Sequence, residues 1–261
     1  MNAVKDKIGP MLVCQNVPGS VSEKSGRSGE KYLATPELNH DLVFLLNMGF
    51  RYKATGKVDG TCTLVQNGAL YKRRDIKQGH GKKKQVIPPD WFQTGADGGT
   101  GGHLIGFMPL DKGDKWHTDC HVQTQDGYDM NLINTLDLND TMTGLCYKQV
   151  PIQSLDGHSV EVMGPRFQAN PHQLKMHCVI RHGLIELQGF PDLSLFTTKT
   201  DEMKGYTDPL QSIKDWFTQS PQGPYLEGVV LHFENGHMFK IHRHHLDLEW
   251  SKAPPLEQIR L

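Results

Sequence analysis

One dipeptide constrains this chain most, because Asn-Gly between two runs of strand-forming residues is the strongest short-range signal for a β-hairpin. It stands at Asn235-Gly236. The residues before it, 226–234, and after it, 237–243, are rich in the β-branched and aromatic residues that strands favour. A two-residue turn at this dipeptide places Glu234 opposite His237.

This register predicts which side chains share a face of the hairpin. Leu231 then faces Lys240, and Val229 faces His242. Paired residues lie on the same side of a sheet, and so do alternate residues along one strand. Glu227 therefore points the same way as Lys240 and His242, so we expect a carboxylate and two basic side chains on one face.

A second Asn-Gly dipeptide, Asn67-Gly68, predicts another hairpin. Its strands are 61–65 and 70–74. Counting outward from the turn pairs Arg73 with Cys62.

The other elements follow from capping signals and apolar periodicity. A short helix is expected over 41–50, capped by Asn39 or Asp41, and another helix begins at Pro209 with an apolar face. The remaining expectations are strands at 158–163, 179–188 and 226–233, a loop over 15–31, and a flexible Gly-, Pro- and Lys-rich stretch over 75–114.

Composition sets few limits on function. A chain of 261 residues forms one large domain or two small ones. The net charge is −1, yet seven basic residues stand against one acid between Lys72 and Lys84, which is either a solvated loop or a surface for phosphates. Five cysteines without a CxxC pair disfavour a disulfide framework or a zinc site. With no secretory signal and no apolar run of membrane length, we expect a soluble intracellular protein of the cytoplasm.

The tetrapeptide Lys57-Val58-Asp59-Gly60 is the first candidate for chemistry. It places a primary amine two residues before a carboxylate and next to a glycine turn. An amine placed in this way can attack the α-phosphate of a nucleotide. Alone, the pattern is weak, because it arises by chance in roughly one chain of this size in twenty at average composition.

Attack by an amine requires its neutral form, so nearby cations or a metal must lower the amine's pKa from its usual value of about 10.4. Arg73 and Lys240 are candidates for the positive groups at phosphate oxygens. Asp59, Glu161 and Glu227 supply carboxylates, which Mg²⁺ binds together with water. These parts suit the transfer of a nucleoside monophosphate onto the lysine.

Five motifs in a consistent order resemble those of ATP-dependent RNA ligases of the covalent nucleotidyltransferase superfamily. The likeness is greatest to the vertebrate-type 5′–3′ RNA ligase and its viral and microbial relatives, and it covers about residues 52–250. The motifs are Lys57-Val-Asp-Gly-Thr, Leu70-Tyr-Lys-Arg-Arg-Asp-Ile-Lys, Val160-Glu-Val-Met-Gly-Pro-Arg-Phe-Gln-Ala-Asn-Pro, Leu226-Glu-Gly-Val-Val, and Met238-Phe-Lys-Ile-His-Arg with its continuation to Trp250.

The resemblance implies a role for each candidate residue. Lys57 forms the lysyl-AMP phosphoramidate, and Asp59 supports it and helps to hold the metal. Glu227 binds the metal at the α-phosphate, which Lys240 contacts directly. These four form the implied catalytic set. The implied nucleotide-binding set is Lys57, Gly60, Arg73 (ribose or incoming phosphate), Glu161 (ribose hydroxyl), Glu227, Lys240 and His242.

The chain departs from the family pattern at two positions. His242 stands where many relatives have a second Lys or Arg, and a neutral imidazole is a weaker phosphate clamp whose charge depends on pH. Gly56 stands where relatives often have Glu. Alternation along the strands does not show which of Arg73 and Arg74 faces the nucleotide, because the turn within the tetrapeptide interrupts the alternation. The resemblance assigns this role to Arg73.

A histidine-rich tail leaves a second interpretation open. His242 and His244 share a strand face at a spacing that suits zinc. The related ligases hold no zinc there, and histidine is common on polar strands, so we favour the interpretation without zinc. The histidines concerned are His232, His237, His242, His244 and His245.

The fold class implied is α+β, the nucleotidyltransferase (adenylation) domain of RNA and DNA ligases, with antiparallel sheets flanked by helices and no C-terminal OB-fold. Twenty-one residues follow Lys240, which is fewer than the five strands of an OB-fold need. We expect a single domain over residues 1–261 with a Gly- and Lys-rich insertion at about 75–157, and a monomer.

The function implied is an ATP-dependent RNA ligase in RNA repair, which joins 5′-phosphate and 3′-hydroxyl RNA ends through a lysyl-AMP and an AMP-RNA intermediate. The expected cofactors are ATP and Mg²⁺, with Mn²⁺ as a substitute, and no membrane is expected as a partner. The alternatives are a GTP-dependent mRNA capping-type guanylyltransferase, a polynucleotide ligase acting on DNA, and a binding protein with a decayed site.

Overall fold

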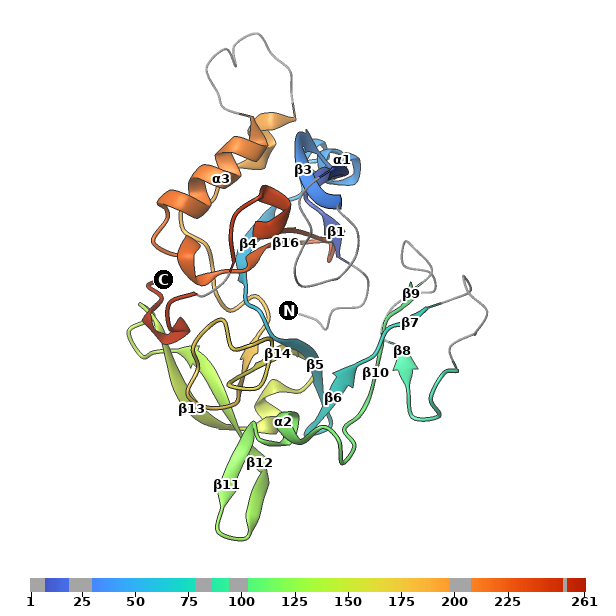
Figure 1. The fold of residues 1–261 in the computed structure, drawn as a ribbon, viewed down its shortest axis with the longest axis vertical. Helices are drawn as coiled ribbons and strands as arrows, with labels where there is room; N and C mark the ends of the chain where they lie inside the picture. Colours follow the sequence, from blue (N-terminus) through green and yellow to red (C-terminus); the bar gives the residue numbers. More distant parts are fainter. Residues whose placement is uncertain (1–7, 19–29, 78–85, 94–102, 198–207, 251–252) are drawn as a thin grey trace. The chain divides into compact units, whose positions relative to one another are not determined.

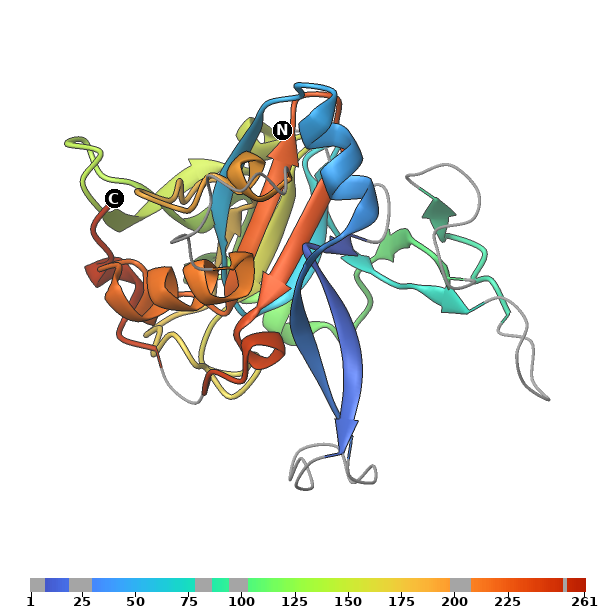
Figure 2. The ribbon, with the colours of Figure 1, turned by 90° about the horizontal axis from the view of Figure 1, so that it is seen from above.

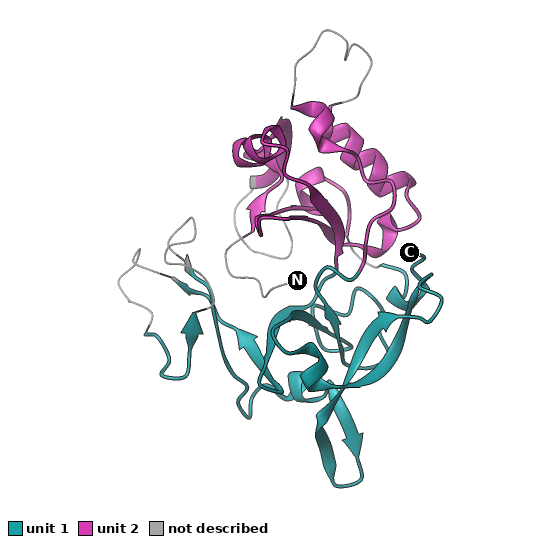
Figure 3. Cartoon of the chain, turned by 180° about the vertical axis from the view of Figure 1, so that it is seen from behind, with its two compact units in different colours: residues 1–7, 58–184, 252–260 teal, residues 8–57, 185–251, 261 magenta. Residues whose placement is uncertain are grey.

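The computed structural model describes residues 8–18, 30–77, 86–93, 103–197, 208–250 and 253–261. The chain divides into two compact units (Figure 3). Unit 1 is built mainly from residues 58–184, and unit 2 mainly from residues 8–57 and 185–251. The chain passes from unit 2 to unit 1 between Lys57 and Val58, inside the tetrapeptide singled out above.

In its described residues, unit 2 contains a four-stranded sheet in the order β1-β17-β16-β4 (Figure 2). All neighbours are antiparallel except β1 and β17. One face of this sheet is apolar and buried, because it carries Val229, Leu231, Phe239 and Ile241, which pair across β16 and β17. The strands are β1 (Gly9–Pro10), β4 (Tyr52–Lys57), β16 (Gly228–Phe233) and β17 (Met238–His242).

Unit 2 also contains two helices and a β-ribbon, whose strands are β2 (Leu12–Pro18) and β3 (Glu30–Leu38). Helix α1 (His40–Asn47) begins where Asn39 accepts a hydrogen bond from the Asp41 N–H. Helix α3 (Pro209–Gln219) begins where Asp208 accepts one from the Gln211 N–H. The described part of the unit also contains short 3-10 turns: η2 (Leu193–Phe196), η4 (Gly223–Tyr225) and η5 (Arg243–Leu246).

The register predicted for the hairpin of β16 and β17 is wrong by one residue. Phe233, rather than Glu234, faces His237: the Phe233 N–H donates to the His237 carbonyl at 2.9 Å. The reason is the turn, because Gly236 has a φ of 91° and its N–H donates to the Phe233 carbonyl at 2.9 Å. This is a three-residue turn that ends in a left-handed glycine.

The correction changes the cross-strand partners. Lys240 pairs with Val230, not with Leu231, and His242 pairs with Gly228, not with Val229. Lys240 and His242 still share a face, because they alternate along one strand. Glu227 precedes the first residue of β16, so the parity argument does not place its side chain.

Unit 1 is organised around a larger, mostly antiparallel sheet, which has nine strands among the residues that the structure describes (Figure 1). Its order is β11-β12-β15-β14-β5-β6-β10-β8. Strand β13 pairs with residues 132–138 of β12. The strands are β5 (Thr61–Gln66), β6 (Ala69–Arg73), β8 (Phe92–Gln93), β10 (Gly106–Pro109), β11 (His121–Thr124), β12 (Gly127–Leu138), β13 (Leu145–Pro151), β14 (Ser159–Met163) and β15 (Cys178–Arg181).

The hairpin of β5 and β6 confirms the prediction from the first Asn-Gly. Gln66 pairs with Ala69, and Asn67 and Gly68 both have positive φ, 51° and 69°, as a two-residue hairpin turn requires. Smaller elements of this unit are β7 (Ile76–Lys77), β9 (His103–Leu104), α2 (Lys115–Thr118), η1 (Ile152–Leu155) and η6 (Leu256–Gln258).

Several predicted boundaries need correction. The predicted loop over 15–31 is wrong at both ends, where β2 and β3 lie; its residues 19–29 are outside the described part. The strand predicted over 179–188 ends at Arg181, because the chain turns through Gly183, whose φ is 78°. The stretch 75–114 contains β10, which pairs with β6, so it is not without strands.

The helix predicted over 41–50 ends earlier, at Asn47. Lys82, Lys83, Lys84 and the run from Gly98 to Gly102 lie outside the described residues. The coarse fold class is confirmed: the structure is a mixed α+β fold, rich in strands and with few helices. Within the residues described, no helix is long and apolar enough to cross a membrane.

Candidate active site

Lys57 ends β4 and belongs to a row of three paired residues in unit 2. Gly228 pairs with Lys57 on one side and with His242 on the other, so the three share one face of the sheet. A Cβ at Gly228 would lie 2.3 Å from the Ile241 carbonyl oxygen, which only glycine tolerates. The middle of the row therefore has no side chain, and it leaves space between the outer two.

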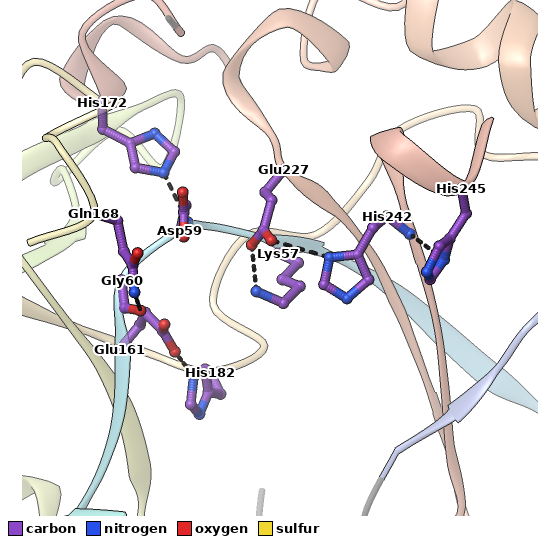
Figure 4. A network of polar contacts seen from close by, with 10 residues as sticks. All are labelled: Lys57, Asp59, Gly60, Glu161, Gln168, His172, His182, Glu227, His242 and His245. Atoms are coloured by element: carbon purple, nitrogen blue, oxygen red, sulfur yellow. Dashed lines mark hydrogen bonds and ion pairs between the residues drawn. The ribbon is translucent and has the colours of Figure 1, made fainter. Parts of the chain in front are cut away.

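The carboxylate of Glu227 occupies this space (Figure 4). One of its oxygens is ion-paired with the Lys57 amine, and the other lies 3.0 Å from Nδ1 of His242. The backbone of Glu227 is held on both sides, since its N–H donates to the Lys57 carbonyl and its carbonyl accepts from the Arg243 N–H, each at 2.9 Å. Glu227 thus connects the lysine and the histidine directly.

Burial raises the pKa of Glu227, but the hydrogen bond from His242 and the charge of Lys57 outweigh it and lower that pKa to about 2. Burial also lowers the pKa of His242, against the opposing effect of the Glu227 carboxylate. We therefore assign a neutral imidazole at neutral pH, protonated on Nδ1 and donating to Glu227.

Lys240 lies in the next row of the same face, where it pairs with Val230 on β16 and with Pro10 on β1. Its backbone carbonyl accepts a hydrogen bond from the Met11 N–H at 2.8 Å, which fixes the strand. Unit 2 therefore presents two lysines, a carboxylate and an imidazole on a single sheet face.

The histidines after β17 are close to one another. The rings of His242, His244 and His245 have centroids 4.2–5.2 Å apart. Burial, followed by the neighbouring histidines and lysines, lowers the pKa of His245 to about 3. The described residues contain no group of three or more His, Cys, Asp or Glu side chains placed to hold a metal ion, so the zinc interpretation gains no support.

In unit 1, the chain turns tightly after Lys57. The Asp59 N–H donates to Nε2 of His172 at 2.9 Å. A Cβ at Gly60 would lie 2.4 Å from the Val162 carbonyl oxygen, so the turn requires glycine there. His172 is fully buried and fixes the backbone of the tetrapeptide. The sequence reasoning missed this residue, although it directly follows the Asn-Pro that ends the third motif.

Unit 1 also carries a second row of paired residues, and its register places the two arginines on different faces. Glu161 on β14 pairs with Cys62 on β5, and the register of the hairpin places Cys62 opposite Arg73 on β6. Glu161, Cys62 and Arg73 therefore share a face, while Arg74 points to the other side. The choice of Arg73 as the nucleotide-binding residue came from the resemblance and stays a prediction.

The two charged members of this row have separate partners. The Arg73 guanidinium makes two hydrogen bonds to Asp75, at 2.7 and 3.0 Å. The buried Glu161 carboxylate lies 2.7 Å from Nε2 of His182 (Figure 4). Nδ1 of the same imidazole lies 2.9 Å from the Ser159 hydroxyl. His182 was not predicted, because nothing in its local sequence distinguishes it from any other polar residue after a strand.

A lysine amine held by an ionised carboxylate, with a second lysine on the same sheet face, is compatible with an enzyme that acts on phosphorylated substrates. Comparison with known proteins makes the class more specific. The family model for RNA ligase 1 matches residues 94–259, which is more than half of the chain. The chain belongs to the RNA ligase 1 family.

Individual relatives agree with this assignment. RNA ligase 1 of Danio rerio is 26% identical over 241 residues, which cover 77% of this chain and 69% of that protein. RNA ligase 1 of Mus musculus is 24% identical over 282 residues, which cover 92% of this chain and 80% of that protein. Family membership confirms the resemblance stated from the five motifs and the expected enzyme class, an ATP-dependent RNA ligase.

Proposed function

We propose that this protein joins RNA 5′-phosphate and 3′-hydroxyl ends through a lysyl-AMP intermediate on Lys57 and an AMP-RNA intermediate. The observation that carries the proposal is the position of the Lys57 amine, which is held by Glu227 at the end of β4. The fold assignment to the nucleotidyltransferase class, as one domain with an insertion at 75–157, is part of the same proposal.

In the first step, Nζ of Lys57 attacks the α-phosphorus of ATP. The new P–N bond replaces the P–O bond to pyrophosphate, which leaves. The ion-paired ammonium gives up one proton to solvent before it attacks and a second proton to solvent as the P–N bond forms. Because the pKa of Glu227 is about 2, this carboxylate is too weak a base to keep the proton. Its role is to orient the amine before attack, which is a large part of catalysis in such sites.

Mg²⁺ suits this arrangement, because it keeps several water ligands and binds through one or two carboxylates together with substrate phosphates. Glu227 is ionised, and each of its carboxylate oxygens contacts one polar group, so it fits such a site, and Asp59 is the second carboxylate that we propose. Bound there, the ion would neutralise phosphate charge and add positive charge that favours the neutral amine.

The remaining residues bind the nucleotide in this proposal. Lys240 contacts the α-phosphate, and the Glu161 carboxylate accepts a hydrogen bond from a ribose hydroxyl. Arg73 contacts the ribose or the incoming phosphate after it exchanges its hydrogen bonds with Asp75 for hydrogen bonds to substrate. Gly60 allows the close approach of backbone to nucleotide. His242 is a positioning residue for Glu227, which differs from the phosphate clamp implied by resemblance.

The last two steps take place on RNA. A 5′-phosphate oxygen attacks the lysyl-AMP phosphorus, so that AMP moves to the RNA and the lysine amine is regenerated. A 3′-hydroxyl then attacks the 5′-phosphate, the phosphodiester bond forms, and AMP leaves. RNA is distinguished from DNA by its 2′-hydroxyl groups.

Covalent labelling tests the first step. The wild-type protein, incubated with Mg²⁺ and α-labelled ATP, is expected to acquire an acid-labile label that GTP does not give. Lys57→Ala should abolish the label. Lys53→Ala is the matched control, because Lys53 lies on the same strand and face and is also ion-paired with a glutamate, Glu186. Labelling by GTP alone, or a label that survives Lys57→Ala, would contradict the proposal.

Sealing assays test the substrate. Nicked RNA with a 5′-phosphate should be joined, and the same nick in DNA should be joined far less efficiently. Equal sealing of both would contradict the RNA preference and favour a general polynucleotide ligase.

A further inference from the structure

An exposed tryptophan of unit 1 lies outside the residues assigned above. Trp116, on the short helix α2 that leads into β11 (Figure 1), leaves 36% of its surface exposed. The ring of His177 stacks on it, with centroids 5.6 Å apart and planes 23° apart. The indole is therefore presented to solvent with one aromatic neighbour already in place.

This ring has firm support behind it. The edge of Phe167 contacts His177 at a centroid distance of 5.7 Å, and Phe167 in turn contacts His117 at 5.3 Å. Phe167 and His117 are buried. Because burial lowers the pKa of His177, this imidazole is uncharged at neutral pH and acts as a stacking surface. An indole supported in this way loses little conformational entropy when a ligand stacks on it.

Two cations accompany the ring. The Lys115 ammonium lies 5.2 Å from the ring centroid, and the Arg166 guanidinium lies 5.5 Å from it. Both side chains are exposed. Of the nearby carboxylates, Asp119 lies 3.8 Å from Nδ1 of His177, whereas Asp111 and Asp114 are ion-paired with a different lysine, Lys72, at 2.8 and 2.5 Å. The positive charge beside Trp116 is therefore not cancelled by these two acids.

We propose that Lys115, Trp116 and Arg166 form a binding surface for a single-stranded segment of the RNA substrate. A flat ring takes a nucleobase by stacking, and an arginine plane extends that surface. Lys115 and Arg166 lie over the ring, and in this proposal their long side chains move aside to pair with the phosphates on either side of the stacked base. A base of any identity stacks, so the surface holds the strand without reading its sequence. The choice of RNA as the ligand rests on the proposed function.

Equilibrium binding of the full-length protein to a fluorescent single-stranded RNA, without ATP, tests this surface. Trp116→Ala should weaken binding roughly fivefold to a hundredfold, which corresponds to the ~1–3 kcal/mol of one stacked base. Trp116→Phe keeps a ring and should retain most of the affinity. Arg166→Ala should weaken binding and lower the slope of log Kd against log salt by roughly 0.7, as expected for one lost phosphate contact on a single strand.

Two controls separate this surface from general effects. Phe44→Ala removes an aromatic ring that is 62% exposed on α1 of unit 2, and Lys148→Ala removes a partly buried cation of unit 1 that is ion-paired with Asp140; neither should change RNA affinity. Covalent labelling by ATP should be unchanged in Trp116→Ala and Arg166→Ala, which also shows that these variants are folded.

The outcomes are distinct. If Trp116→Ala and Arg166→Ala bind RNA as the wild type does, the surface is not an RNA site, and a protein partner becomes the better assignment. Because Arg166 is exposed, its variant decides the matter even where the Trp116 variant fails to fold. Failure of the proposed function would appear elsewhere, as a wild-type protein that binds RNA but takes no label from ATP.

Discussion

The two rows of paired residues, one in each unit, are built alike but distribute their charges differently. In unit 2, a single carboxylate serves two partners, because Glu227 contacts both Lys57 and His242. These three side chains form one connected group. Gly228, in the middle of the row, makes room for it.

In unit 1, each charged residue has its own partner. Arg73 is held by Asp75, and Glu161 is held by His182. Between Arg73 and Glu161 stands Cys62, a partly buried thiol whose pKa is raised to about 12 by burial and by the Glu161 charge, so it stays neutral.

This difference indicates where the effects of two substitutions should be coupled. Residues in one hydrogen-bonded network give strongly non-additive effects when they are substituted, whereas residues with separate partners give nearly additive ones. Substitutions in the Glu227 group should therefore be large and coupled, and those around Arg73 small and independent.

The largest effect is expected for Glu227→Gln. The amide keeps the shape of the side chain but loses the ion pair that orients the lysine amine and the charge that would bind Mg²⁺. A misplaced reacting group costs on the order of a hundredfold, so lysyl-AMP formation should slow by at least about that factor. Single-turnover labelling with ATP measures it. Glu186→Gln is the control. It removes the ion-pair partner of Lys53, which lies on the same strand as Lys57, and should leave the labelling rate unchanged. A Glu227→Gln rate near that of the wild type would refute the role of the Lys57–Glu227 ion pair.

The next effect is expected for His242→Ala, which removes the Nδ1–H donor to Glu227. Hydrogen bonds to a charged group contribute about 1.5–3 kcal/mol, which predicts a tenfold to hundredfold slower labelling. His242→Asn keeps a neutral donor and should recover most of the rate, while His237→Ala, at an exposed position of the same hairpin, is the control. If the asparagine variant is as slow as the alanine variant, donation to Glu227 is not what His242 provides.

Double variants test directly whether substitutions are coupled in unit 2 and independent in unit 1. In the Glu227→Gln, His242→Ala pair, the effects on labelling should be much less than additive, because either change alone already disrupts the group. The corresponding pair in unit 1, Asp75→Asn with Glu161→Gln, should be additive within experimental error.

Sequence reasoning predicted the local features of both rows better than their register. Asn67-Gly68 specified a two-residue turn, and the pairing of Cys62 with Arg73 followed. Asn235-Gly236 looked equivalent, but its glycine alone is left-handed, and the turn takes one residue more. A one-residue difference in turn length is invisible in composition, yet it exchanges the faces of a strand.

The contacts of Glu227 show a second limit of sequence reasoning. The prediction that it lies beside His242 came from a wrong register, while the contact itself comes from a residue just outside β16. His172 and His182 were missed for a similar reason. Each reaches its partner from a loop that is distant in sequence, 113 residues in the case of Asp59 and His172. Strand periodicity carries no information about such contacts.

A smaller effect is expected on the pH dependence of stability, which should differ between the histidine cluster of unit 2 and isolated histidines. An unfolded histidine takes up a proton below about pH 6.5, whereas burial and the neighbouring histidines lower the pKa of His245 to about 3. The unfolded state therefore binds more protons between these values, and stability falls as the pH falls from 7 to 5. His245→Gln should reduce this loss by ~1–2 kcal/mol, measured by amide hydrogen exchange in β17. His40→Gln, at an exposed position, should leave this loss of stability unchanged. An equal loss of stability between pH 7 and 5 in the wild type and in His245→Gln would contradict the lowered pKa of His245.

The smallest effect is expected for Asp75→Asn. The Arg73–Asp75 pair is only partly buried, with side-chain exposures of 25% and 35%, and such pairs contribute about 0–1 kcal/mol. Since the pair must open for Arg73 to contact substrate, weakening it should change the KM for ATP less than about fivefold and leave kcat unaltered. Asp111→Asn, at an exposed partner of Lys72, controls for the loss of one negative charge in unit 1. A loss of activity as large as that of Glu227→Gln would mean that Arg73 and Asp75 act as one group, and the contrast between the two units would no longer hold.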